Sequence, residues 1–216
     1  MKKNLFSLLA VIFIAMCIVY ILPSGSVAAQ DSNDPVVLAV VGPMTGAGAA
    51  QGLYAESGAI IAAEKINESG GVNGRMIEII GFDDKGDPAE AALVAQRIVD
   101  DERIFAVVGH MWSSCTLAAL QIYADANMPV LAPSSSNNQV TALGYMNLIR
   151  MCHRESVFNP AVAGLIVNNF KHENIALFYP NDDFGLGNAQ VIKAKLDELG
   201  AKIVYEAPFK PNQDKD

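Results

Sequence analysis

Short apolar runs alternate with segments of helical spacing along most of the chain. Four runs rich in β-branched residues are predicted to be strands: 35–42, 75–84, 104–109 and 128–133. The segments between them are predicted to be helices: 49–71, 87–102 and 113–127. Strands and helices in this order form a parallel sheet with right-handed crossovers. Most of the strand runs are almost wholly apolar, so we expect both faces of the sheet to be covered.

The predicted helix 87–102 carries a clear local signal at its start. Asp87 is placed as the N-cap, Pro88 takes the first helical position and Glu90 the third. This order is typical of a capping box, in which the side chains of the cap and of the third residue each accept a bond from the other's backbone N–H.

The pattern changes after residue 133. Residues 134–156 form a polar loop with room for a short helix, followed by the strand-like "NLIRM". A second series of helices and strands follows: 156–170, 174–180, 183–200 and 201–209. Its two clear strands are too few to bury a doubly wound sheet on both faces, so we expect a truncated chain or a fragment. The expected organisation is an N-terminal lobe, a hinge crossover and a partial second lobe: 30–148, 149–155 and 156–216.

The first 29 residues have the order of a secretory signal. Lys2 and Lys3 precede an apolar run from Leu5 to Leu22, and the small residues Val27 and Ala29 suit cleavage after Ala29. The length of the apolar run leaves an uncleaved anchor helix as the alternative. We therefore expect an exported, extracytoplasmic protein, which in a two-membrane cell means a periplasmic one.

Charge and cysteine content narrow the range of partners. The formal net charge is −8, and loss of the two signal lysines makes it −10. Such an acidic chain is not expected to bind nucleic acid. Cys115 and Cys152 follow the signal, and either a disulfide or two free thiols is compatible with their spacing. That spacing matches no zinc motif, and we predict neither a metal nor a cofactor.

A parallel sheet binds its ligand beyond the carboxyl ends of its strands. Four loops are predicted there: "GPMTGAGAAQG" (42–52), "DDKGD" (83–87), "GHMWSS" (109–114) and "APSSSNN" (132–138). The first does not complete a dinucleotide motif, because Gln51 takes the place of its third glycine. Asp83 and Asp84 lack a third metal ligand at suitable spacing, and we expect them to shape their loop.

The start of the predicted helix 113–127 is the best candidate for a ligand site. We expect Ser113 or Ser114 to cap it and its free N–H groups to attract an anion such as a carboxylate. A purely structural cap is the alternative. His110 is expected to end the preceding strand, because no G-x-S-x-G turn places it as a base for a serine. Hydroxyl-rich strand ends without an acid and base suit binding a small polar molecule better than cleaving one, so we predict no catalytic residue.

Several segments together resemble a known family. They are "VVGPMTGAGAAQG", "AAEKINESGGVNGRMIEIIGFDDKGDPAEA", "VVGHMWSSCT" and "LAPSSSN". The chain from about Val36 onward resembles the type I periplasmic solute-binding proteins of ABC importers, in the branch of the leucine/isoleucine/valine-binding protein. This resemblance implies an α/β fold with two doubly wound parallel-sheet lobes that close on an amino acid.

The resemblance also implies roles for individual residues. Ser113 matches a serine whose hydroxyl binds the ligand carboxylate, and Ser135 matches a residue whose backbone carbonyl takes the ammonium group. Ser136 matches a threonine that binds through its hydroxyl and N–H, and Phe184 matches a tyrosine that covers the ligand. Gln51 stands where the relative has a tryptophan against the ligand side chain, which leaves the side-chain preference open.

A disulfide of that relative has no counterpart here. The resemblance places its two halves at Gly86 and Trp112, neither of which is a cysteine. Whether Trp112 packs in the core or faces the ligand is left open by the sequence.

Three functions are compatible with the sequence. The first is an extracytoplasmic receptor that captures an amino acid, of the branched-chain type or a related small amide, and delivers it to the membrane permease of an ABC transporter. The second is a ligand-sensing domain of a receptor or regulator on the same fold. The third, a hydrolase using Ser113 or Cys115, ranks last because no base is placed near either residue.

Overall fold

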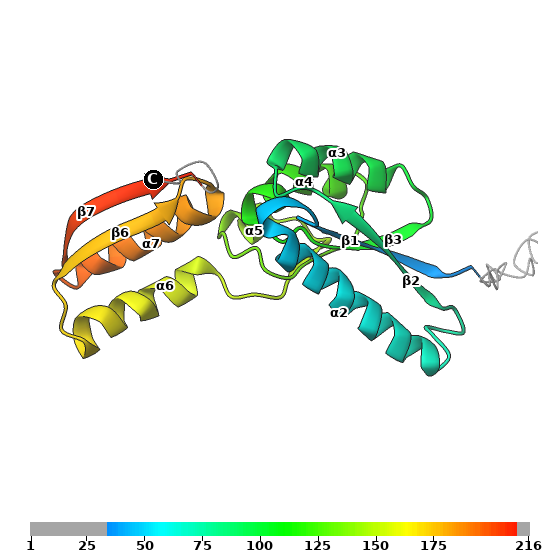
Figure 1. The fold of residues 1–216 in the computed structure, drawn as a ribbon, viewed down its shortest axis with the longest axis horizontal. Helices are drawn as coiled ribbons and strands as arrows, with labels where there is room; N and C mark the ends of the chain where they lie inside the picture. Colours follow the sequence, from blue (N-terminus) through cyan, green and yellow to red (C-terminus); the bar gives the residue numbers. More distant parts are fainter. Residues whose placement is uncertain (1–33, 211–216) are drawn as a thin grey trace, which may run out of the picture. The chain divides into compact units, whose positions relative to one another are not determined.

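The computed structural model describes residues 34–210, and the predicted alternation of strands and helices is present in them (Figure 1). The predicted signal sequence lies outside the described residues. Within 34–210, no helix is both long enough and apolar enough to cross a bilayer.

Five parallel strands form the first sheet, in the order β2-β1-β3-β4-β5. Their bounds are β1 Val36–Gly42, β2 Ile77–Asp83, β3 Ile104–Val108, β4 Val130–Ala132 and β5 Leu148–Arg150. The helices between them are α2 Ala49–Glu68, α3 Pro88–Val99, α4 Ser113–Asp125 and α5 Gln139–Ala142, with a short 3-10 turn, Gly46–Gly48, before α2. The strand-like "NLIRM" segment is thus the edge strand β5, which pairs with β4 from Val130↔Leu148 to Ala132↔Arg150.

The second series of elements contains two parallel strands, β6 Asn174–Pro180 and β7 Lys202–Phe209. The helix α6 Glu155–Gly164 continues as a π-helical turn, Leu165–Asn169, and α7 Asp183–Glu198 joins the two strands. The helices α6 and α7 pack against each other. Each predicted element of this series is present, within a few residues of its predicted bounds.

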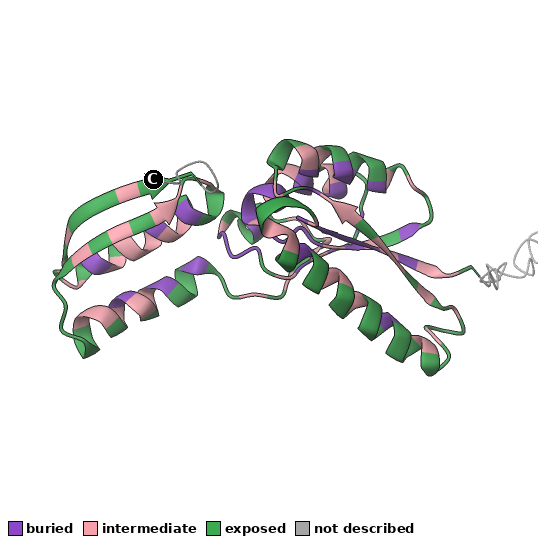
Figure 2. Cartoon of the chain, in the orientation of Figure 1, coloured by how far each residue is buried: buried purple, intermediate pink, exposed green. Residues whose placement is uncertain are grey.

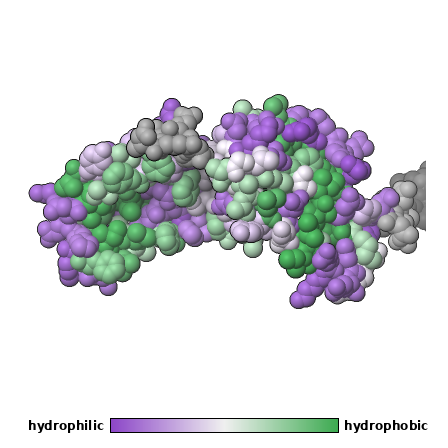
Figure 3. Space-filling view, in the orientation of Figure 1, coloured by the Kyte–Doolittle hydropathy of each residue, from purple (hydrophilic) through white to green (hydrophobic). Residues whose placement is uncertain are grey.

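The hydrophobic core lies on one face of the first sheet. Side chains of β1 and β3 meet those of α3 and α4 there, and α2 runs along the other face (Figure 1). Figure 2 shows the buried residues concentrated in β1, α3 and α4. Helices thus cover both faces of the sheet, as predicted, although apolar side chains of α2 such as Ile60 and Ile61 remain exposed, at 40% and 65%. Figure 3 shows apolar side chains at the surface, and the strands β6 and β7 expose Phe178 and Tyr205 as well.

The start of α3 follows half of the predicted capping box. Oδ1 of Asp87 accepts bonds from the N–H groups of Ala89 and Glu90, both at 2.9 Å, as predicted for an N-cap. The reciprocal half of the prediction is wrong. The N–H of Asp87 donates to the carbonyl of Asp84 at 2.9 Å, and the Glu90 carboxylate pairs with Lys85 and Arg97. The preceding turn therefore takes the N–H that the box would use.

Two glycines of α2 differ in the space around them. A Cβ added to Gly52 would lie 2.3 Å from the backbone oxygen of Pro43, while a Cβ on Gly58 meets nothing within 4 Å. We expect Gly52→Ala to lower the free energy of unfolding by about 2 kcal/mol, because α2 must move away from the loop after β1. Gly58→Ala is expected to raise it by about 1 kcal/mol through helix propensity. Urea denaturation of both variants tests this, and equal effects would contradict the close packing at Gly52.

Candidate ligand-binding site

A cavity of about 310 Å³ lies beyond the carboxyl ends of the first sheet's strands. Its wall combines residues from the first turn of α2, the loop after β3, the start of α4 and the loop after β4 with residues from the region of β6, α7 and β7. The residues that line it are Gln51, Met111, Trp112, Ser113, Ser114, Ser134, Pro180, Asp182, Phe184 and Phe209. Four of the predicted site residues, Gln51, Ser113, Ser114 and Phe184, are thus brought to one cavity.

A second, larger cavity of about 620 Å³ lies against α7. The loop 137–139, Glu155 and the exposed face of α7 line it, and the start of α4 does not contribute. The smaller cavity is the better candidate because it combines the helix start and hydroxyl groups with an aromatic wall, as small-molecule sites commonly do.

The start of α4 differs from the predicted cap. Trp112, with extended backbone angles, is the N-cap, and its side chain makes no capping bond. Ser113 is therefore the first helical residue, and the prediction that Ser113 or Ser114 caps the helix is wrong. The hydroxyl oxygen of Ser113 instead accepts a bond from the N–H of Asn137 at 3.3 Å. The helix start thus presents N–H groups that no side chain of residues 34–210 caps, which is the arrangement that binds anions.

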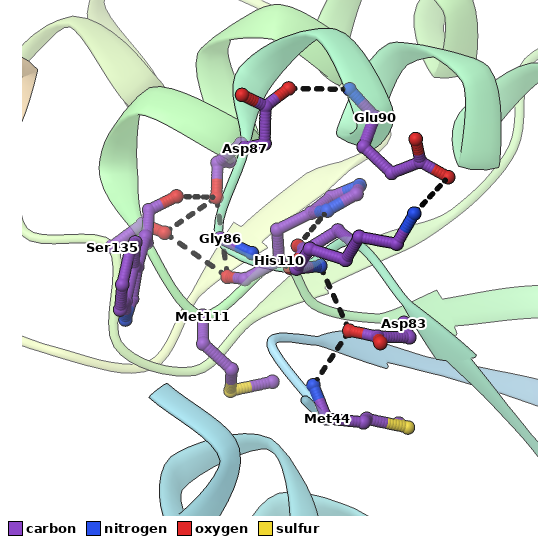
Figure 4. Close-up of polar contacts among 12 residues, drawn as sticks. Met44, Asp83, Gly86, Asp87, Glu90, His110, Met111 and Ser135 are labelled. Atoms are coloured by element: carbon purple, nitrogen blue, oxygen red, sulfur yellow. Dashed lines mark hydrogen bonds and ion pairs between the residues drawn. The ribbon is translucent and has the colours of Figure 1, made fainter. Parts of the chain in front are cut away.

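Ser135 and Ser136 do not contribute to the lining of this cavity. The Ser135 hydroxyl bonds to the backbone oxygen of His110 at 3.1 Å (Figure 4) and to Thr116 Oγ1 at 2.5 Å. Its carbonyl, which the resemblance assigns to the ligand ammonium, accepts a bond from Arg150 Nη1 at 3.2 Å. The Ser136 hydroxyl is buried and has no hydrogen-bond partner within the part of the chain that the structure describes.

Ser134 lines the cavity in their place, and sequence reasoning missed it. Its hydroxyl donates to the backbone oxygen of Met111 at 2.5 Å. Three successive serines follow β4, and a loop has no periodicity that would tell which of them faces a ligand.

Asp83 holds the loop that follows β1. Its carboxylate accepts bonds from the N–H of Met44 (Figure 4) and the hydroxyl of Thr45, at 2.8 and 2.5 Å, and from the N–H of Lys85 at 2.8 Å. Partial burial opposes ionisation, but these hydrogen bonds outweigh it and lower the pKa of the Asp83 carboxyl. Asp83 is thus an ionised acceptor that ties two strand-end loops together.

A buried chain of polar side chains lies behind the site. His110 Nδ1 lies 2.7 Å from Asp84 Oδ2, and His110 Nε2 lies 3.1 Å from the hydroxyl of Tyr123. Asp84 and His110 are fully buried and Tyr123 is nearly so. A carboxylate only accepts, so Nδ1 carries the proton, and in the neutral ring Nε2 accepts from Tyr123. Burial, with a contribution from the Asp84 charge, raises the pKa of Tyr123, which keeps its hydroxyl protonated.

These three buried side chains do not line the cavity. Sequence reasoning placed His110 at the strand end but did not pair it with residues 26 and 13 positions away. Because the chain fixes the backbone just before Trp112 and Ser113, its role is to hold the site in place.

Both described cysteines are free thiols, which resolves the alternative left open by the sequence. Burial, assisted by the Asp84 charge, raises the pKa of Cys115 to about 12. A thiol that stays protonated is a poor nucleophile. The geometry therefore gives no support to a hydrolase that uses Cys115.

Comparison with known proteins agrees with the resemblance. A family model described as "Periplasmic binding protein" matches residues 35–216. An amino acid binding protein of Pseudomonas aeruginosa is 39% identical over 180 residues, which cover 83% of this chain and 48% of that protein. The leucine-, isoleucine-, valine-, threonine- and alanine-binding protein of the same organism is 33% identical over 196 residues, covering 90% of this chain and 51% of that protein.

Solved structures are similar as well. The substrate-binding protein LivJ of Streptococcus pneumoniae, in complex with isoleucine, has a TM-score of 0.76 at 26% identity, covering 82% of this chain and 50% of that one. The leucine-binding protein LivK of Thermotoga maritima also has a TM-score of 0.76, at 28% identity, covering 84% and 50%. The chain spans about half the length of the curated relatives it matches. The predicted type I fold is confirmed, and this chain belongs to the periplasmic binding protein family.

Proposed function

We propose that this protein is an extracytoplasmic receptor that binds an amino acid and delivers it to the permease of an ABC transporter. The observation that carries the proposal is the start of α4, where uncapped N–H groups and the hydroxyls of Ser113 and Ser114 line a cavity that Phe184 also lines. The relatives support it, because the matched proteins are named for binding amino acids and LivJ was solved with isoleucine.

The ligand carboxylate would lie at the start of α4. The partial positive charge of a helix N-terminus favours an anion there. The Ser113 oxygen already accepts a bond from Asn137, so its own O–H remains available to donate to a carboxylate. Ser114, the next residue of the helix, adds a second hydroxyl to the same wall.

The ligand ammonium group needs an acceptor on the same wall. Asp182 lines the cavity, and its Oδ1 accepts from the N–H of Gly185 at 2.8 Å. Its second oxygen is suited to an ammonium group. The carbonyl of Ser135, by contrast, already meets the Arg150 guanidinium. The roles that the resemblance gives to Ser135 and Ser136 remain predictions.

Release to a permease requires a change of conformation. Ser113 and Phe184 come from different α/β series of the chain, so a ligand that touches both favours the conformation in which they approach each other. The residues 149–155 between the series are the predicted hinge. We place the protein in the periplasm or its extracytoplasmic equivalent, as the family name suggests.

Ser113→Ala is expected to weaken amino-acid binding by about ten- to a hundredfold, because a hydrogen bond to a charged group contributes about 1.5–3 kcal/mol. Isothermal titration with amino acids, small amides and urea measures this. Ser156→Ala, in the first turn of α6, removes an exposed hydroxyl from a similar position in another helix and is expected to leave affinity unchanged. Absence of heat with every compound would overturn the proposed function, while equal affinity in Ser113→Ala would overturn the role of Ser113.

A further inference from the structure

Trp112 is the one tryptophan of the sequence, and it lies on the wall of the cavity. Its indole ring fits between Gly48, the N-cap of α2, and Gly86, in the loop between β2 and α3. A Cβ added to Gly86 would lie 2.4 Å from Cζ3 of the ring, and one added to Gly48 would lie 2.9 Å from Cζ2. Trp112 is thus held by the loops that follow β1 and β2, and a Cβ at either glycine would collide with its ring, at Gly48 together with the ring of Pro43.

The indole also sets the orientation of Gln51. Nε1 of Trp112 donates to Oε1 of Gln51 at 2.6 Å. An indole N–H can only donate, so it must face the amide oxygen and not the amide nitrogen. The amino group of Gln51, with its two N–H donors, is therefore the end left for another partner. Because Gln51 lines the same cavity, a bound molecule can meet these donors there.

The rest of the wall is mostly apolar. Met111, Pro180, Phe184 and Phe209 provide hydrocarbon and aromatic surface. A side chain placed among them would be desolvated, and a polar end would need a partner. The amino group of Gln51 can donate a hydrogen bond to an oxygen of such a side chain. The carboxylate of Asp182 on the same wall would repel a second negative charge, which favours a neutral acceptor over an acidic one.

We propose that Trp112 and Gln51 form the side-chain specificity site, and that they select an amino acid whose side chain ends in a carboxamide. The proposal rests on the proposed function, since it names the kind of amino acid bound. The Gln51 amino group donates to the carboxamide oxygen, and the Trp112 indole holds Gln51 in the orientation that makes this possible. Trp112 therefore has two roles: its ring lines the cavity, and its N–H positions the Gln51 side chain.

Fluorescence of Trp112 gives a direct measurement, because emission from this single tryptophan reports on the cavity itself. We would titrate the purified protein with glutamine, asparagine, leucine, glutamate and lysine. The expected result is that a carboxamide amino acid binds at least about tenfold more tightly than leucine, in keeping with one hydrogen bond that leucine cannot make. Tighter binding of leucine than of both carboxamides would overturn the proposal.

Gln51→Glu tests the role of the Gln51 amino group as a hydrogen-bond donor to the ligand. A glutamate still accepts the Trp112 N–H but offers an acceptor to the ligand in place of the amino group. We expect carboxamide binding to weaken by about tenfold or more and lysine binding to strengthen. Gln190→Glu, on the exposed surface of α7, adds the same charge outside this cavity and is expected to leave the order of preference unchanged. An unchanged order in Gln51→Glu would overturn the proposal.

Trp112→Phe tests the positioning role. Phenylalanine keeps an aromatic ring but cannot donate to Gln51, so its amide becomes free to turn. Isothermal titration is expected to show a smaller preference for carboxamides over leucine, and an unchanged preference would overturn this role. If either variant fails to fold, Gln51→Leu repeats the comparison of carboxamide and leucine binding. The binding preference of Gln51→Leu is expected to move toward leucine. If the unaltered protein binds no amino acid, the proposed function itself fails, which is distinct from a changed order of preference.

Discussion

His110→Phe is expected to lower the free energy of unfolding by about 3–5 kcal/mol. Phenylalanine retains an aromatic ring but removes both nitrogens, which leaves an oxygen of Asp84 and the hydroxyl of Tyr123 buried without their partner. The cost is this large because the buried Asp84 carboxylate loses a hydrogen-bond donor and cannot regain water in its place. The bond from Gly86 N–H to the other oxygen of Asp84 remains, but it cannot replace the lost one.

Urea denaturation, followed by circular dichroism, measures the effect of His110→Phe. Tyr123→Phe is the matched control, because it removes only the Tyr123 hydroxyl and leaves the His110–Asp84 bond intact. Its expected loss is about 1 kcal/mol. A loss below 1 kcal/mol in His110→Phe would show that the buried chain does not stabilise the fold. Since His110 lies three residues before Ser113, the same variant is also expected to bind ligand more weakly.

Ile98→Ala is the second large effect, with an expected loss of about 2–5 kcal/mol. Ile98 is fully buried in the core where α3 meets β1, β3 and α4. Alanine removes three carbon atoms from this closely packed space, so the loss combines transfer of the apolar atoms with the cavity that remains. The size of the loss depends on how far α3 can move to fill that space.

Leu93→Ala provides the control on the same helix. Leu93 is 61% exposed, so its replacement by a residue of similar helix propensity is expected to change the free energy of unfolding by less than about 0.5 kcal/mol. Both variants would be compared by urea denaturation. Equal losses at the two positions would contradict the assignment of the core to the Ile98 side of α3.

The proposed ligand site and the hydrophobic core both depend on the loop 109–113. The buried Asp84–His110–Tyr123 chain fixes one side of it, and the packing of Trp112 on Gly48 and Gly86 fixes the other. The N–H groups at the start of α4 are therefore held in place before a ligand arrives. Such pre-organisation lowers the entropy that binding must overcome.

The sequence by itself determined the alternation of strands and helices, the parallel sheet and the N-cap at Asp87. It also placed Ser113 at the start of a helix that follows a strand. These features depend on patterns within a few residues, namely apolar runs, helical spacing and capping side chains, and the resemblance added the family. The resemblance also named Gln51 and Phe184 as ligand-binding residues; both line the same cavity as Ser113 and Ser114, and their contact with a ligand stays a prediction.

Only the tertiary structure decided which distant side chains meet. Trp112 bonds to Gln51 across 61 positions, and His110 finds Asp84 across 26. It also decided that Trp112, not a serine, precedes α4, and that Ser134 faces the cavity while Ser135 is buried. The reason is that these contacts depend on the order and register of neighbouring strands and on the paths of the loops between them. Neither leaves a periodic trace in the sequence, because loop residues do not repeat with the spacing of a helix or strand.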